Sequence, residues 1–348
     1  MPTLAKAKSS NLSFAPSYLP VAVFAGGTSG IGQAMAEAFA QQMKGRARIV
    51  LLGRNAAAAE AILARLPKPT DDDGWAHEFV PCDATSMAGV RAVCAALRAR
   101  LPYINFLVMT AGENCMTECW ETPEGLDHHL SIRYYSRYMY VKELLPHLVV
   151  AKEKGMDAHV LSVQAGGLGL TIPTDDLGLD NARRSTIKML RGVMLSFAAM
   201  KGIMRGGAYG DGLVTHFAAQ HPELTFTYTN PGQVTTPMSV YFNLGWLLTP
   251  LAWLVTYVVM PLLQKPPEDS AQYMLYALFN SERGVFMRNQ YGNLVSSHVC
   301  EAAHSTEFDG TAQKVGVRHG EPMKGYGGSD ARVKLLIEHT ERVLGAIP

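Results

Sequence analysis

VAVFAGGTSGIG, residues 21–32, is the stretch of sequence that decides the fold of this chain. It starts as an apolar β-strand, passes through a glycine-rich turn and ends where a helix begins. The helix is predicted by apolar residues at helical spacing, which are Ala34, Met35, Ala38, Phe39 and Met43. A turn built on Gly26, Gly30 and Gly32 lets the backbone approach the phosphates of a dinucleotide, whose charge is favoured at a helix N-terminus. The alternative is a turn that only packs a helix on a sheet, but the flanking strand and helix favour binding.

The bulk composition fits a protein with a large core and no polyanionic partner. The chain has 348 residues, 48% of them hydrophobic, and a formal net charge of +1. No basic run suggests a nucleic-acid-binding face. Five cysteines are too few and too scattered for a disulfide framework, and no pair completes a zinc site, so we expect reduced thiols and no metal. Because no long apolar run precedes Val21, we expect no secretory signal, and residues 1–18 are expected to form a flexible arm.

Strand-like and helix-like runs alternate along the chain as far as about residue 230. Strands are expected at 21–25, 48–52, 77–81, 104–110, 158–164 and 224–229, and helices at 31–43, 56–66, 86–100, 124–151 and 190–220. This alternation predicts βαβ units in an α/β fold with a Rossmann-type, doubly wound parallel sheet. We expect a single domain over 19–310, which includes an apolar helical insert, followed by a C-terminal extension over 311–348.

The insert is the run 240–264, in which all 25 residues are uncharged. Its length alone allows a transmembrane helix. Pro250 and Pro261 divide it, however, and Pro267-Glu268-Asp269 begins a further amphipathic helix through Phe279. A buried or lid-like insert is therefore favoured over an interfacial membrane patch and over a true span. The expected location is cytoplasmic, with a membrane contact through 240–264 left open.

A cation follows the second predicted strand. Arg54 stands 22 residues after Gly32, near the place where proteins that prefer NAD carry an acidic residue for the ribose hydroxyls. A guanidinium at this position suits the 2′-phosphate of NADP(H). The alternative is a solvated surface arginine, and we favour NADP(H) as the cofactor.

These features resemble the short-chain dehydrogenases/reductases over about residues 20–240. The spacing of the three glycines is similar to the cofactor loop of that family, with Ala25 where the family usually has Thr. Thr110-Ala111-Gly112 stands where the family usually has Asn-Ala-Gly. Three stretches resemble a divergent fungal group with degenerate catalytic residues, namely 23–32, Tyr134-Tyr135-Ser136-Arg137 and Tyr228-Thr229-Asn230-Pro231-Gly232.

The resemblance implies a sheet of about seven strands and a set of cofactor-binding residues. Asp83 would bind the adenine side, Pro231-Gly232 would cover the nicotinamide side, and Thr235 would contact the cofactor amide. The whole expected set is Gly26, Thr28, Ser29, Gly30, Ile31, Gly32, Arg54, Asn55, Asp83, Ala111, Gly112, Lys201, Pro231, Gly232 and Thr235.

The catalytic half departs from the family. There a Tyr transfers the proton at the carbonyl oxygen, a Lys four residues later lowers the pKa of that Tyr, a Ser orients the substrate, and an Asn completes a proton relay. Here Lys201 has Phe197 four residues before it, and Arg133 stands at the Asn position. The Ser position falls at Gln164 or Ala165.

The candidate catalytic residues are therefore atypical ones: Lys201, Tyr209, Ser162 and Arg133. Ser162 is the hydroxyl nearest to the Ser position. Tyr209 becomes a candidate acid because 177–208 is longer than the family usually allows, and Tyr134 and Tyr135 are others. For each tyrosine the alternative is a place in the core or at a subunit contact. His128 and His129 are interpreted as surface residues.

Three functions are open. The favoured one is an NADP-dependent oxidoreductase that transfers a hydride between nicotinamide and a carbonyl or alcohol of an apolar small molecule, with secondary metabolism as its setting. The alternatives are a non-redox enzyme on the same fold, such as an isomerase, cyclase or dehydratase, and a non-catalytic NADP-binding protein. Members of the family often pair through two long helices, here near 124–151 and 190–220, so a homodimer is an expectation, although the insertion in 177–208 lies near that interface.

Overall fold

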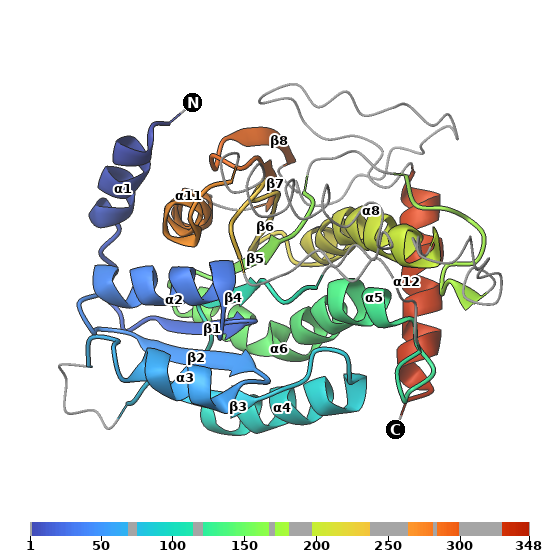
Figure 1. Ribbon diagram of the computed structural model, residues 1–348, viewed down its shortest axis with the longest axis horizontal. Helices are drawn as coiled ribbons and strands as arrows, with labels where there is room; N and C mark the ends of the chain where they lie inside the picture. The colour runs from blue at the N-terminus through green and yellow to red at the C-terminus, as the bar shows by residue number, and fades with distance from the viewer. Residues whose placement is uncertain are drawn as a thin grey trace, which may run out of the picture.

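A single sheet in the order β3-β2-β1-β4-β5-β6-β7-β8 forms the centre of the molecule (Figure 1). The computed structural model describes residues 2–68, 75–113, 121–166, 171–180, 197–236, 264–280, 284–298 and 329–347. Strands β1 to β7 are parallel, and β8 is antiparallel to β7. The strands are β1 (Val21–Ala25), β2 (Arg48–Gly53), β3 (Glu78–Pro81), β4 (Phe106–Met109), β5 (His159–Val163), β6 (Thr225–Thr229), β7 (Gly284–Arg288) and β8 (Leu294–His298). The strand order reverses between β1 and β4, and ligands of doubly wound sheets bind at such a point.

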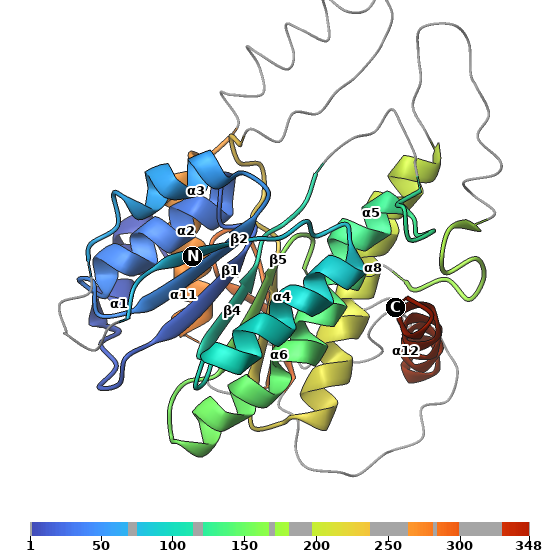
Figure 2. The same ribbon diagram turned by 90° about the horizontal axis from the view of Figure 1, so that it is seen from below.

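Helices cover both faces of the sheet (Figure 2). One face carries α1 (Leu4–Ser13), α2 (Gly30–Gln42), α3 (Ala56–Leu63) and α11 (Pro267–Phe279). The other carries α4 (Met87–Arg100), α5 (His128–Leu130), the π-helix η1 (Ser131–Tyr135), α6 (Ser136–Glu153), α8 (Phe197–Gln220) and α12 (Asp330–Gly345). Since both faces are covered, β1, β4 and β5 are buried along their whole length, and β1 and β4 are continuous apolar runs. The predicted doubly wound fold is confirmed.

The N-terminal arm is ordered, contrary to our expectation. Residues 4–13 form α1, which packs on α11, and Phe14 stacks on Phe279 with ring centroids 4.2 Å apart. Asn11 is fully buried and its amide donates to the backbone carbonyl of Gln272 at 2.9 Å. The physical reason is a strip of aromatic surface on α11 and β4 that α1 and Phe14 remove from water.

The C-terminal helix α12 belongs to the same core as the sheet. Val333, Leu336 and Ile337 are buried within the cluster that contains α4, α6 and α8. The hydroxyl of Tyr134 lies 2.8 Å from that of Thr340, and Tyr138 donates to Glu341. Helix α12 therefore packs on η1, α6 and α8, which are the helices where we expected a subunit contact.

The remaining differences between the predicted and the observed elements lie in the C-terminal part of the chain. The helix through Phe279 is confirmed as α11, whereas no residue range was predicted for β7, β8 or α12. The apolar run 240–264 lies outside the described residues except for Gln264, as does 181–196 within the predicted insertion. In the part of the chain that the structure describes, no helix has the length and apolarity needed to cross a membrane.

Candidate functional site

The glycine loop has the close backbone approaches that the sequence predicts. Gly26 has φ +95°, and a Cβ there would lie 2.6 Å from the backbone nitrogen of Ala111. Gly30 has φ +55°, and a Cβ on Gly32 would lie 2.3 Å from the carbonyl oxygen of Gly26. Helix α2 begins at Gly30, and the side chain of Ser29 makes no capping hydrogen bond. The first turn of α2 thus presents backbone N–H groups without a side-chain cap, as an anion site at a helix N-terminus requires.

Thr110 joins this loop to the end of β4. Its hydroxyl donates to the carbonyls of Ala25 and Gly26, at 3.3 Å each, and its backbone N–H donates to Ala25 at 2.8 Å. A threonine thus makes the connection at the position where the resembling family usually has an asparagine. The bonds place Ala111 and Gly112 beside the loop, and their role in cofactor binding stays a prediction.

The residues expected at the adenosine end lie at the carboxyl ends of β2 and β3. A Cβ on Gly53 would lie 2.5 Å from Oγ1 of Thr28, so Thr28 packs on the turn that carries Arg54. Asn55 caps α3 by accepting from the backbone N–H of Ala58 at 3.0 Å. Asp83 is exposed and accepts from the backbone N–H of Thr85 at 2.9 Å. The structure therefore brings these predicted residues together beside the loop.

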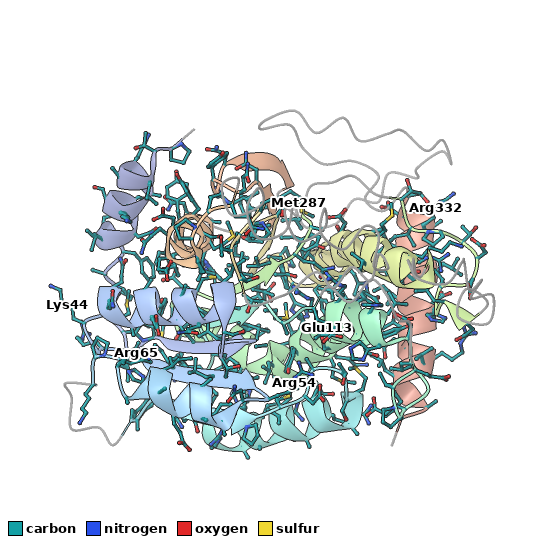
Figure 3. The ribbon with its side chains drawn as sticks, viewed as in Figure 1. Lys44, Arg54, Arg65, Glu113, Met287 and Arg332 are labelled. Atoms are coloured by element: carbon teal, nitrogen blue, oxygen red, sulfur yellow. The ribbon has the colours of Figure 1, made fainter. Side chains whose placement is uncertain are left out.

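Glu113 is a residue of this site that the sequence analysis missed. One carboxylate oxygen contacts Nε2 of His128, and the other lies 4.0 Å from the guanidinium of Arg54 (Figure 3). The hydrogen bond from His128, with the charge of Arg54 adding to it, lowers the pKa of Glu113. Its backbone carbonyl accepts from the guanidinium of Arg133. The one signal in the sequence was its place directly after Thr110-Ala111-Gly112 at the end of a strand.

The segment after β6 crosses to the start of α2. Gly232 has φ +71°, and its N–H donates to Oδ1 of Asn230 at 2.9 Å, which fixes the turn after Pro231. Thr235 is held by its backbone N–H, which donates to Lys265 at 2.9 Å. A Cβ on Gly30 would lie 3.2 Å from Cγ2 of Thr236. The predicted nicotinamide-side residues and the glycine loop are thus brought to one edge of the sheet.

Ser162 does not face that edge. It is 2% exposed, and its hydroxyl accepts from Arg137, which lies on α6. Because alternate side chains of a strand point to opposite faces, Ser162 points into the layer of α6. This position does not support the expected role of orienting a substrate.

Tyr209 is a core residue, which corrects its expected role as an acid. It is fully buried, its ring lies 5.1 Å from that of Tyr134, and its hydroxyl donates to the carbonyl of Leu177 at 3.0 Å. Burial also raises its pKa, which disfavours the phenolate. Tyr134 and Tyr135 point to α12, where they meet Thr340 and His339. None of the three tyrosines is placed to reach a substrate at the cofactor edge.

The side of helix α8 that faces His129 and Arg133 carries glycines. A Cβ on Gly202 or Gly206 would lie 2.9 Å from Cβ of His129 or Arg133, respectively. Lys201 precedes this face and is exposed. Its role at the cofactor ribose stays a prediction.

Two buried arginines lie near this face of α8. Arg133 is 7% exposed and Arg137 is 2% exposed, and burial lowers the pKa of each to about 10. His128 and His129 are also buried, contrary to the surface positions that we expected. Gly202 and Gly206 form a face of α8 without side chains, which we call the glycine face, and it lets α8 lie close to His129 on α5.

The arrangement is that of a Rossmann-type protein with the loop geometry of the dinucleotide-binding class. The family profile described as "short chain dehydrogenase" matches residues 20–170. By this match, residues 20–170 belong to the short-chain dehydrogenase/reductase superfamily.

Individual relatives agree with this assignment. The chain is 29% identical to "Oxidoreductase andH" of Emericella variicolor, with 79% of this chain and 74% of the relative aligned. It is 29% identical to "Oxidoreductase AN1596" of Emericella nidulans, with 70% of this chain and 66% of the relative aligned. A solved structure of Pseudomonas aeruginosa RhlG, described as an NADP active-site complex, matches with a TM-score of 0.54 and 19% identity, covering 81% of this chain and 99% of that one.

Proposed function

We propose that the chain is an NADP(H)-dependent oxidoreductase that transfers a hydride between nicotinamide and a carbonyl or alcohol of an apolar small molecule. The observation that carries the proposal is the open glycine loop at the end of β1, with Arg54 beside it after β2. The cofactor supplies the hydride, and the chain positions it through the backbone of the loop. The names of the fungal relatives and the NADP complex of RhlG support the assignment. The apolar run 240–264 supports an apolar substrate, and a setting in secondary metabolism stays a prediction.

Arg54 would select NADP(H). Its side chain is 62% exposed and therefore accessible to a 2′-phosphate, which it would bind by charge-assisted hydrogen bonds. Asn55 and Asp83 would border the adenosine. Within this site Arg133, rather than a tyrosine, stands at the substrate end.

A titration with NADPH and NADH, followed by nicotinamide fluorescence, tests the proposal. We expect Arg54→Asp to weaken NADPH binding about ten- to a hundredfold and to leave NADH binding nearly unchanged. Arg65→Asp is the matched control, because Arg65 is also an exposed arginine paired with a glutamate, and Figure 3 shows it toward the other end of the sheet. Absence of NADPH binding by the unmodified chain would contradict the proposal.

One observation favours a second candidate, a non-redox enzyme on the same fold. No tyrosine of the described α8 residues faces Arg133, so the usual proton donor is missing there. Consumption of NADPH in the presence of a panel of apolar ketones would decide between the candidates. Turnover of substrate without NADPH oxidation would favour the non-redox enzyme.

A further inference from the structure

A polar centre lies between η1, the end of β5 and α8, and the proposed function leaves it without a defined ligand. It consists of Arg133, Arg137 and Gln164, which we call the guanidinium centre. A Cβ on Gly206 would lie 2.9 Å from Cβ of Arg133 and 3.1 Å from Nε2 of Gln164, so both side chains meet the same point of α8. The strand end that carries Gln164 is the edge at which the glycine loop also lies.

Arg137 contributes a buried positive charge. Its guanidinium donates to the carbonyls of Met109, Ala111 and Val163, at 3.0, 2.8 and 3.2 Å, and to the hydroxyl of Ser162. All of these acceptors are neutral, and no carboxylate of the described residues forms an ion pair with Arg137. A buried cation without an ionised partner favours an anion nearby.

Gln164 contributes an amide whose bonding capacity is unused. Its backbone is fixed, because its N–H donates to the carbonyl of Thr229 at 2.9 Å. Its side-chain Nε2 and Oε1 are both buried, and neither has a hydrogen-bond partner within the described ranges. Buried amide groups are almost always hydrogen-bonded, so an unpaired one at a site edge points to a polar atom of a ligand.

Two carboxylates lie near the centre, and the charge of Glu113 raises the pKa of Arg133, although burial lowers it by more. Glu113 is engaged by His128 and Arg54 through its carboxylate, and Arg133 contacts its backbone carbonyl. Asp211 is buried and acts on Tyr228. With two guanidiniums and an amide donor, the centre matches an anion that accepts several hydrogen bonds in one plane.

We propose that Arg133 and Gln164 bind a carboxylate of the substrate, with the charge of Arg137 behind them favouring the anion. The substrate is then an oxo acid or hydroxy acid with an apolar body. This inference rests on the proposed oxidoreductase function for the reacting carbonyl, but the carboxylate site itself is defined by the residues of this chain alone. Arg133 would be a binding residue of the substrate and Arg137 a positioning residue.

Calorimetric titration of the full chain with 4-oxopentanoate and with its methyl ester tests the inference, both with and without saturating NADP⁺. The two probes differ only in the negative charge and the methyl group that masks it. We expect the acid to bind about ten- to a hundredfold more tightly than the ester. Arg133→Gln should remove this preference, and Gln164→Leu should weaken binding of the acid at nearly constant side-chain volume. Arg205→Gln is the control, since Arg205 is on the same helix and donates to the carbonyl of Asp176 outside the centre.

Equal affinity for acid and ester, binding of neither probe, or an unchanged preference in Arg133→Gln would overturn the inference. If Arg133→Gln does not fold, Gln164→Leu tests the carboxylate site instead, because this substitution removes no charge. An unaltered affinity of Gln164→Leu for the acid would contradict the site. NADPH titration separates this result from the proposed function. A chain that binds NADPH without preferring the acid keeps the function and loses the carboxylate site, whereas the opposite pattern keeps the site and loses the function.

Discussion

Glycine has opposite structural roles in the loop after β1 and in the glycine face of α8. In the loop, Gly26 and Gly30 adopt positive φ angles, and the backbone is left open toward a ligand. In α8, Gly202, Gly206 and Gly210 have no positive φ, and each faces a bulky side chain of another element, His129, Arg133 or Tyr228. The first set exposes backbone donors, and the second lets α8 lie close to α5, η1 and β6.

This difference explains why the two halves of the site relate so differently to the family. The cofactor half depends on backbone geometry, which a short local sequence can preserve. The proposed substrate half depends on side chains that converge from η1, α6 and the end of β5 on the glycine face of α8. There Arg133 and Gln164 fill the space next to α8. Tyr134, Tyr135 and Tyr209 lie in the core, and the hydroxyls of Tyr134 and Tyr135 face α12.

The largest effect is expected from the core behind the glycine face of α8. Leu336 on α12 is fully buried and lies near Gly212, whereas its neighbour Leu335 is 37% exposed. Leu336→Ala should lower the free energy of unfolding by about 2–5 kcal/mol because it leaves a cavity. Leu335→Ala should change it by less than about 0.5 kcal/mol. Urea unfolding measures both, and equal effects would mean that α12 is not part of this core.

Gly26→Ala tests the loop side of the comparison. The added methyl group would lie 2.6 Å from the backbone of Ala111 at φ +95°, so the loop must move away from β4. We expect NADPH affinity to fall about a hundredfold or more, which corresponds to about 2.7 kcal/mol. Gly155→Ala is the control, because Gly155 also has a positive φ but nothing lies within 4 Å of the added atom. Unchanged NADPH binding in Gly26→Ala would place the cofactor elsewhere.

Gly206→Ala tests the α8 side. Its methyl group would displace Arg133 and the amide of Gln164, at a cost of about 1–3 kcal/mol in stability. We expect binding of 4-oxopentanoate to weaken while NADPH binding is retained. Gly345→Ala on α12 has open space around it and serves as the control. A parallel loss of both ligands would show that the two halves are not separable.

Glu113→Gln tests the residue that joins the halves. Removing the carboxylate 4.0 Å from Arg54 leaves the guanidinium free for a 2′-phosphate, so NADPH should bind about two- to fivefold more tightly. NADH lacks this phosphate and should bind as before. Glu60→Gln, an exposed substitution on α3, is the control, and equal changes for NADPH and NADH would contradict the interpretation.

The smallest effect is the contribution of Glu113 to the pH dependence of the free energy of unfolding. The pKa of Glu113 is lowered in the folded state, mainly by the hydrogen bond from His128. Its contribution to stability is therefore present above the unfolded pKa of about 4.3 and is lost as the pH falls through the folded value. Thermal unfolding from pH 6 to pH 3 should show a shallower loss in Glu113→Gln, by less than about 1 kcal/mol because the pair is partly exposed. A slope equal to that of the unmodified chain would exclude this contribution.

The sequence by itself determined the alternation of strands and helices, the glycine loop and the place of Arg54, because each depends on residues close together in the chain. It also determined that the usual tyrosine is absent before Lys201. Only the tertiary structure decided that Tyr209 is a core residue, that Ser162 faces α6, and that Arg133 meets Gln164 across the glycine face of α8. Local periodicity predicts which face of an element is buried, but it contains no information on which distant side chains share that burial.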